Sequence, residues 1–349
     1  MKKLSYLNKV IVGDCFKIMS EMDEQSVDLV VTSPPYWGIR SYEIDSKIWG
    51  GDSNCEHLWD NKNKCLKCDA WKGELGLEPH PQMFIKHLVE FGKLVSRVLK
   101  PTGLFWLNLG DTFCGGGKSK KNQLLWQTNH SYLSTPPGAN VEMDGGWLQP
   151  KQLLMMPSRV ACRLQDDGWI LRSDIIWHKS NHMPEGIKDR FSKTYEHFFM
   201  FSKQSKYYFN LDAVRVPHKA SVNNPNWKNT YIRKATNKTA DIGKIQNIVK
   251  EYNPLGKNPG DIWEVTPQPF HGSHFAVFPE NLIERIIKSS CPTDGIVLDP
   301  FSGSGTSLYI AHKLGLNYIG IDIKQEYVKM AEERIEGKIF KKTRNVKND

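Results

Sequence analysis

The segment of this sequence best suited to chemistry is Thr32-Ser33-Pro34-Pro35-Tyr36-Trp37, which follows a short apolar run. Prolines fix the backbone and donate no N–H, so the carbonyls of Ser33 and Pro34 are held in a rigid turn. With a side-chain oxygen, they could accept both N–H groups of an exocyclic amino group, as on cytosine or adenine, and so localise its lone pair. Tyr36 or Trp37 could stack on the base, which must leave the duplex to be reached. A Pro-Pro loop among core aromatics is the alternative.

A glycine-rich turn near the other end of the sequence predicts a nucleotide site. Asp299-Pro300-Phe301-Ser302-Gly303-Ser304-Gly305-Thr306 follows one apolar run, and a second run ends at Asp322, where a carboxylate can accept hydrogen bonds from ribose hydroxyls. The turn lacks the Lys of a P-loop and the third Gly of a dinucleotide fingerprint. Asp299 would repel a pyrophosphate but could pair with an ammonium. S-adenosylmethionine, with an α-amino group and no phosphate, fits these features. A turn that serves only packing is the alternative.

Three of the seven cysteines cluster with a histidine in one polar segment. Cys55, His57, Cys65 and Cys68 give C-x-H, seven residues and then C-x-x-C, which is suited to tetrahedral zinc. Because protein would fill all four positions, the zinc would be structural; free thiols in an insertion are the alternative. The odd cysteine count and the lack of a secretion signal argue against a disulfide framework.

Apolar periodicity around these segments predicts an α/β protein with a mostly parallel sheet. Both chemical segments follow predicted strands, and open α/β sheets bind ligands at the carboxyl ends of their strands. Strands are expected at 27–32, 104–109, 175–177, 198–201, 295–299 and 318–322, and helices at 81–100, 156–164, 279–289, 306–313 and from about 325.

The positive charge of the chain is concentrated in one stretch. The 349 residues carry a net charge of +9, and residues 203–260 alone hold 11 Lys or Arg against three acidic residues. This stretch also contains Trp227, Tyr231 and many Asn, which favours contact with DNA; a solvated linker is the alternative. The sequence has no run of about 18 apolar residues and begins without the apolar region of a secretion signal, so we expect a cytoplasmic protein without a membrane span.

Together, the Ser33 and Gly303 segments resemble the two signature motifs of the amino DNA methyltransferases, in the circularly permuted order of the β group. Val12-Gly13-Asp14-Cys15 resembles the acidic motif that approaches the adenine of the cofactor. Further segments that resemble parts of this family are Arg97–Gly103, Thr194–Phe201, Lys206–Phe209 and His274–Leu282.

This resemblance implies a circularly permuted, Rossmann-like sheet of an S-adenosylmethionine-dependent methyltransferase. Residues 1–203 would form the catalytic half, including the zinc insertion at 50–75 and a mobile loop at 113–150. Residues 204–260 would be the target-recognition region, 261–340 the cofactor-binding half and 341–349 a basic tail. The partner would be double-stranded DNA in a prokaryote or phage. A cognate restriction endonuclease on a separate chain and a homodimer are further partners that the resemblance allows.

The resemblance also assigns roles to residues. Ser33 before Pro-Pro favours N4 of cytosine over N6 of adenine, and the absence of a Pro-Cys pair disfavours C5 methylation, which needs a Cys nucleophile. Methyl transfer would be direct, with Ser33, Pro34, Pro35 and Tyr36 as catalytic residues. The residues that would bind the cofactor are Asp14, Asp299, Phe301, Ser302, Gly303, Ser304, Gly305, Thr306 and Asp322. Alternatives are an N6-adenine enzyme of the same fold, an RNA or protein methyltransferase, and a non-catalytic DNA-binding protein.

Overall fold

The computed structural model describes residues 6–39, 41–114, 148–149, 151–182, 184–218, 230–231, 248–249, 253–267 and 277–338. The chain divides into two compact units, one made of Met1–Phe209 with Asp261–Asp349 and the other of Asn210–Gly260. Most of the expected mobile loop at 113–150, most of the basic stretch and the tail at 341–349 lie outside the described residues.

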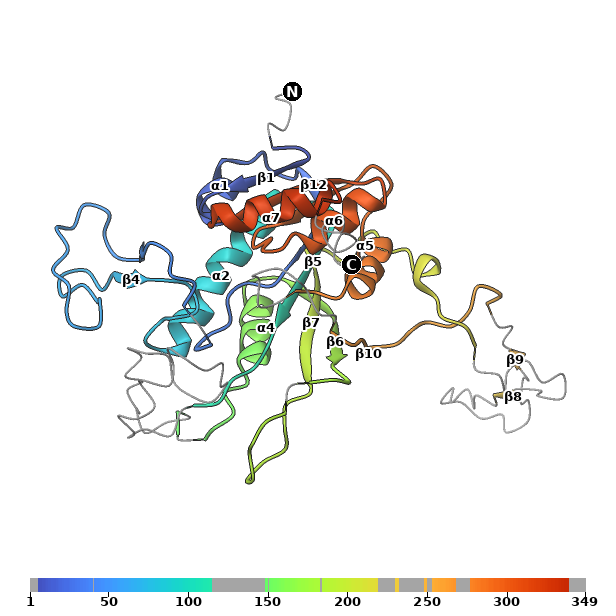
Figure 1. The fold of residues 1–349 in the computed structure, drawn as a ribbon, viewed down its shortest axis with the longest axis horizontal. Coiled ribbons are helices and arrows are strands. Elements are labelled where there is room, and N and C mark those ends of the chain that lie inside the picture. Colours follow the sequence, from blue (N-terminus) through green and yellow to red (C-terminus); the bar gives the residue numbers. More distant parts are fainter. Residues whose placement is uncertain are drawn as a thin grey trace, which may run out of the picture. The chain divides into compact units, whose positions relative to one another are not determined.

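A sheet forms the centre of the larger unit (Figure 1). It has eight strands in the order β1-β12-β11-β2-β5-β7-β6-β10. All neighbouring pairs are parallel except those made by β7, which is antiparallel to both β5 and β6. The strands are β1 (Lys9–Val12), β2 (Val27–Thr32), β5 (Leu99–Leu109), β6 (Ile170–His178), β7 (Tyr195–Ser202), β10 (Ile262–Glu264), β11 (Ile296–Asp299) and β12 (Asn317–Asp322).

Helices contribute to two apolar clusters, one on each face of this sheet. Strand β2 shows why its sequence is an unbroken apolar run: Val30 belongs to one cluster, Leu29 and Val31 to the other, and all six residues are buried. The first cluster includes residues of α1 (Cys15–Glu21), α2 (Pro81–Val98) and α4 (Met156–Asp166), and the second includes residues of α5 (Glu280–Ser290), α6 (Thr306–Lys313) and α7 (Gln325–Ile335).

The expected elements are present, but several of their boundaries differ, as those of α2 and β6 illustrate. The expected helix at 81–100 ends at Val98, because Leu99 already pairs with Val27 of β2. Strand β6 begins at Ile170, earlier than the three-residue run that the sequence indicates. Its added residues alternate between half-buried and exposed, so they carry little of the apolar signal on which the prediction depends.

Two short ribbons complete the described structure. In the larger unit, β3 (Lys47–Trp49) and β4 (Trp71–Gly73) pair antiparallel and flank the cysteine-containing insertion. In the smaller unit, η1 (Asp212–Val214) precedes the antiparallel pair of β8 (Thr230–Tyr231) and β9 (Ile248–Val249). Among the described residues, no helix combines the length and apolar character that crossing a membrane requires.

Candidate active site

A cleft of about 710 Å³ opens where the strands of the larger unit end. Its walls come from segments that follow β1, β2, β5, β11 and β12, together with the start of β7, which enters from the opposite direction. Both halves of the sequence therefore contribute to one cavity. Of the expected site residues, it is lined by Asp14, Ser33, Pro34, Pro35, Tyr36, Asp299, Phe301, Ser302, Gly303, Ser304, Thr306 and Asp322.

The Ser33 hydroxyl lies in a polar network on the catalytic side of the cleft. Its Oγ is 3.2 Å from the Tyr36 hydroxyl and 3.2 Å from Asn108 Oδ1. The Tyr36 hydroxyl is 2.6 Å from Asn108 Oδ1 and 3.0 Å from Glu196 Oε2, and its single proton can be donated to only one of them at a time. Burial, followed by the charge of Glu196, raises the pKa of Tyr36 well above its usual value, so the phenol stays protonated.

Three members of this network are residues to which the sequence analysis gave no role. Asn108 is a buried polar residue between Leu107 and Leu109 in β5, and its Nδ2 donates to the His197 carbonyl at 3.0 Å, which turns Oδ1 toward Ser33. Glu196 forms an ion pair with Lys179, and both side chains are largely buried and line the cleft. Of these three residues, Asn108 has a signal in the sequence, because it is a polar residue within the apolar run that ends β5.

The ring of Tyr36 has a defined place, and Trp37 does not share its role. A Cβ on Gly110 would stand 2.7 Å from Tyr36 Cε2, so the glycine makes room for the ring. Trp37 is 3% exposed, and its indole N–H donates to the Glu78 carbonyl at 2.9 Å. The suggestion that Trp37 could stack on a base is therefore wrong for this structure, because the side chain belongs to the core.

On the cofactor side, the glycine turn is bound to the end of β12. Gly303 has φ +48°, and its N–H donates to Asp322 Oδ2 at 2.9 Å, while Lys324 N donates to Oδ1 at 2.9 Å. Burial raises the pKa of Asp322 despite these bonds. Ser302 Oγ is buried and has no hydrogen-bond partner among the described residues. Because buried hydroxyls are rarely left unpaired, this atom fits a site that a polar ligand completes.

Asp299 braces the turn rather than presenting a free charge. Thr32 Oγ1 donates to its Oδ1 at 2.6 Å and Phe301 N at 3.2 Å, while Ser307 donates to Oδ2. The residue is 2% exposed, and burial raises its pKa to about 6, although these hydrogen bonds act in the opposite direction. Its contacts join the end of β2 to the turn, so Asp299 connects the two sides of the cleft.

Gly305 is the one expected cofactor residue that does not line the cleft. It has φ +73° and precedes α6, and a Cβ there would stand 2.5 Å from Ala331 Cβ of α7. Because Gly305 has no side chain, the start of α6 can pack closely against Ala331 of α7. Thr306 next to it accepts from the buried Arg334 at 2.7 Å, and Arg334 pairs with Glu280 at 3.1 Å.

Asp14 stands at the cleft as the N-cap of α1. Its Oδ1 accepts from Phe16 N at 2.8 Å, which satisfies a free N–H of the first turn. Its Oδ2 pairs with Lys47 Nζ at 2.6 Å, and that ammonium also lies 4.1 Å from the centre of the Phe16 ring. Lys47 belongs to β3, so the ribbon that flanks the cysteines reaches the cleft wall.

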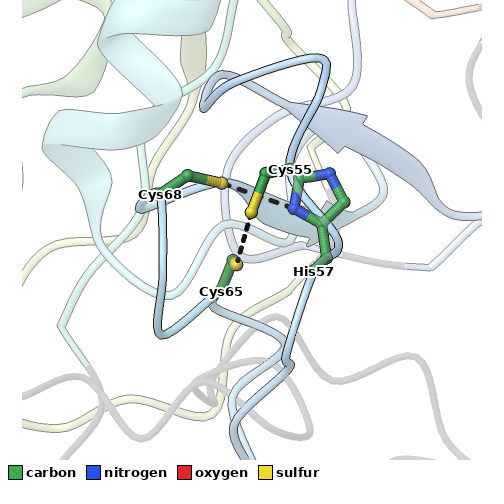
Figure 2. Close-up of side chains that lie close together, drawn as sticks. All are labelled: Cys55, His57, Cys65 and Cys68. Carbon is green, nitrogen blue, oxygen red and sulfur yellow. Dashed lines mark hydrogen bonds between the residues drawn. The ribbon is translucent and has the colours of Figure 1, made fainter.

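The four predicted metal ligands converge within the insertion, as Figure 2 shows. Cys55 Sγ lies 3.9 Å from Cys65 Sγ, and Cys68 Sγ lies 3.3 Å from His57 Nδ1. All four ligand atoms are within 4.8 Å of one another. Zinc with Zn–S of about 2.3 Å and Zn–N of about 2.0–2.1 Å separates tetrahedral ligand atoms by roughly 3.4–3.8 Å. The distances of 3.9 Å and 3.3 Å lie near this range, so the donor set is of the type and spacing that suit this ion.

The fold is that of solved DNA methyltransferases. PvuII DNA methyltransferase (cytosine-N4-specific) matches with a TM-score of 0.57 at 19% identity, covering 95% of this chain and 89% of that chain. A protein of Thermus thermophilus assigned as a DNA modification methylase and solved with S-adenosyl-L-methionine matches with a TM-score of 0.51 at 21% identity, covering 95% and 94%.

Sequence comparison defines the family. The DNA methylase family model (N6_N4_Mtase) matches residues 27–333. Type II methyltransferase M.SmaI of Serratia marcescens is 32% identical over 327 residues, covering 94% of this chain and 90% of the relative. M.XycI of Xanthomonas campestris pv. cyanopsidis is 34% identical over 330 residues, covering 93% and 86%. The chain therefore belongs to the DNA methylase family as a β-group amino DNA methyltransferase, which confirms the resemblance predicted from the sequence.

Proposed function

We propose that this protein transfers a methyl group from S-adenosylmethionine to N4 of cytosine in double-stranded DNA, directly and after the base has flipped out. The observation that carries the proposal is the Ser33 hydroxyl, held between Tyr36 and Asn108 at the end of β2. When Ser33 donates its proton to Asn108 Oδ1, its lone pairs are free to accept an N–H of the cytosine amino group. A neutral oxygen would localise the lone pair of this amino group without removing a proton from it. As the N–C bond forms, the S–C bond of the cofactor would break, and the methylated nitrogen would then release one proton to solvent.

The surrounding residues would supply orientation rather than a covalent intermediate. The Pro34 carbonyl would accept the second N–H, and Tyr36 would contact the base. Glu196, paired with Lys179, holds the Tyr36 hydroxyl. Holding the amino group in line with the methyl donor would accelerate the transfer, because proximity and orientation can lower an activation free energy by on the order of 7–11 kcal/mol.

The cofactor side of the cleft fits S-adenosylmethionine, which would supply the methyl group as a sulfonium. Asp322 would accept from the ribose hydroxyls through lone pairs that its backbone donors leave free. The unpaired Ser302 hydroxyl and the open backbone at Gly303 would receive the methionine part. The bound cofactor in the structurally similar Thermus thermophilus protein supports this choice. Asp299 would act by bracing the turn, because its oxygens already have donors.

The biological setting that we propose is a type II restriction-modification system, as the names of the relatives suggest. In that setting, residues 204–260 would select the DNA sequence, and a cognate endonuclease would be a separate chain. We further propose that Cys55, His57, Cys65 and Cys68 hold a structural zinc ion, because all four tetrahedral positions would be filled by protein.

Methylation of N6 of adenine is the second candidate, because the matched family model covers both reactions. Mass spectrometry of nucleosides from DNA incubated with the protein and S-adenosylmethionine separates the two. N4-methylcytosine is the expected product. N6-methyladenine would keep the fold and the direct mechanism but show that Ser33 does not decide the base. The absence of any modified base, despite measurable cofactor binding, would contradict DNA methyl transfer.

A further inference from the structure

We infer that the metal site at Cys55, His57, Cys65 and Cys68 fixes one wall of the cofactor pocket, so that metal occupancy sets the affinity for the cofactor. The inference rests on the proposed function only for the identity of that cofactor. The four ligands lie in the connection between β3 and β4, and residues of both strands line the cleft.

The metal ligands close the loop of a ribbon that is too short to be stable alone. Strands β3 and β4 have three residues each, with Trp49 paired to Trp71, and the ligands all lie in the connection between them. Isolated two-stranded ribbons are marginal in water. The connection has little apolar core of its own, with Leu58 and Leu66 exposed. A metal that joins its two arms would supply the stability that packing does not.

Backbone contacts transmit the geometry of the ligands to the strands. Cys65 N donates to the Ala70 carbonyl at 2.7 Å, directly before β4, and an isolated bridge pairs Lys64 with Trp71. On the other arm, Gly51 follows β3 closely, and a Cβ there would stand 2.9 Å from Cys68 Sγ. Movement of the thiols would therefore displace residues on both strands of the ribbon.

The base of the ribbon forms part of the cleft wall. Lys47 of β3 pairs with Asp14, and Trp49 lies edge-on to Phe16 with ring centres 5.1 Å apart. Trp49 also stacks on His87 of α2 at 4.2 Å. Lys47, Trp49, Gly73, Glu74 and Leu75 all line the cleft. Loss of the metal would loosen Lys47 and Trp49 beside Asp14, the side on which we expect the cofactor's adenine.

Metal analysis, limited proteolysis and calorimetry on the purified, untagged protein test this inference. We expect one zinc per chain, and trypsin should cut at Lys62, Lys64 or Lys67 only after zinc is removed by a chelator. The dissociation constant for S-adenosylmethionine should rise at least fivefold in the stripped protein and recover when zinc is added back. Cys68→Ser should behave like the stripped protein, whereas Cys162→Ser, at an exposed cysteine of α4, should match wild type.

Protein that neither contains zinc nor takes it up would overturn the metal site. Protein that loses and regains zinc, with the expected change in proteolysis but the same cofactor affinity throughout, would overturn the coupling. If Cys68→Ser does not fold, chelation and restoration of wild-type protein give the same comparison. Methylation is not measured in these experiments, so an error in the proposed base or DNA target would not change their result.

Discussion

At the scale of single residues, the site is a set of short polar contacts between segments far apart in the sequence. Tyr36 and Asn108 are 72 residues apart, and Tyr36 and Glu196 are 160 apart. Ser33 and Tyr36 were predictable because they follow one strand directly. Asn108, Glu196 and Lys179 were not, because only the order of the strands in the sheet brings them to the same point, and a single sequence does not give that order.

Ser33→Ala and Tyr36→Ala should each lower methyl transfer while leaving cofactor affinity largely intact. Each removes a hydrogen-bonding group at the acceptor side, and we expect a loss of roughly 10- to 100-fold in the single-turnover rate. Rapid-quench measurement of methyl transfer, with calorimetry for the cofactor, checks this. Ser20→Ala, at an exposed serine of α1 that bonds to the Lys17 carbonyl, is the control. Equal loss of cofactor binding in both variants would refute the assignment.

Asp299 should make stability depend on pH. Burial raises the pKa of Asp299 from 3.8 to about 6. Between these two pH values, the carboxyl is protonated in the folded protein and ionised in the unfolded chain. The stabilisation from this proton is complete below the ordinary pKa and is lost as the pH rises through 6. Between pH 4 and pH 7, the free energy of unfolding of wild type relative to Asp299→Asn should fall by an amount on the order of 2 kcal/mol.

Urea unfolding of both proteins across this range measures the difference. Asp23→Asn, at an exposed carboxylate, should show no such trend relative to wild type. A pH-independent difference between wild type and Asp299→Asn would mean that Asp299 is ionised throughout, and that its three donors outweigh its burial.

At the scale of elements, the strands and helices that bury apolar residues were predictable, and the directions and short ribbons were not. Strand β2 and helix α6 have the bounds that their sequence patterns indicate. Strand β7 runs antiparallel to its neighbours, and periodicity carries no information about direction. The three-residue strands β3 and β4 are shorter than any pattern of alternation can show.

The contact between α6 and α7 gives a prediction with a closely matched control. Gly305→Ala should lower the free energy of unfolding by about 1–3 kcal/mol more than Gly315→Ala. Both glycines have φ +73°, so an alanine at either position has a similarly strained φ. Only at Gly305 does the added Cβ also approach Ala331 Cβ, at 2.5 Å. Nothing lies within 4 Å of a Cβ at Gly315. If chemical denaturation shows that the two variants lose equal free energy of unfolding, then α7 can shift to accommodate the Cβ at position 305 without loss of stability.

At the scale of the whole molecule, the larger unit holds the cleft, and Asn210–Gly260 forms a unit of its own. This smaller unit has nine Lys or Arg residues against Asp212, Asp241 and Glu251. The sequence predicts contact with DNA for this region from its charge. Most of its residues lie outside the described part of the chain, so its role stays a prediction.

Replacing residues 210–260 with a Gly/Ser linker of the same length should separate DNA binding from cofactor binding. We expect the affinity for S-adenosylmethionine to change by less than about twofold, and the affinity for DNA to fall by at least roughly tenfold with a flatter dependence on salt, because phosphate contacts are lost. Calorimetry and fluorescence anisotropy at several salt concentrations provide these values. Unchanged DNA affinity would place the main DNA contacts in the larger unit.

The pairing of β1 with β12 affects how the protein is made. Lys9 lies opposite Ile319, and Val12 opposite Asp322, while β2 has β11 as one of its neighbours. A ribosome adds about 5–20 residues per second, so Ser33 would wait roughly 15–60 s for the strands that complete its cleft. Strands β1 and β2 therefore lack these neighbours until the chain has been synthesised as far as Asp322. Methylating activity should therefore appear only after the strand that ends at Asp322 has left the ribosome.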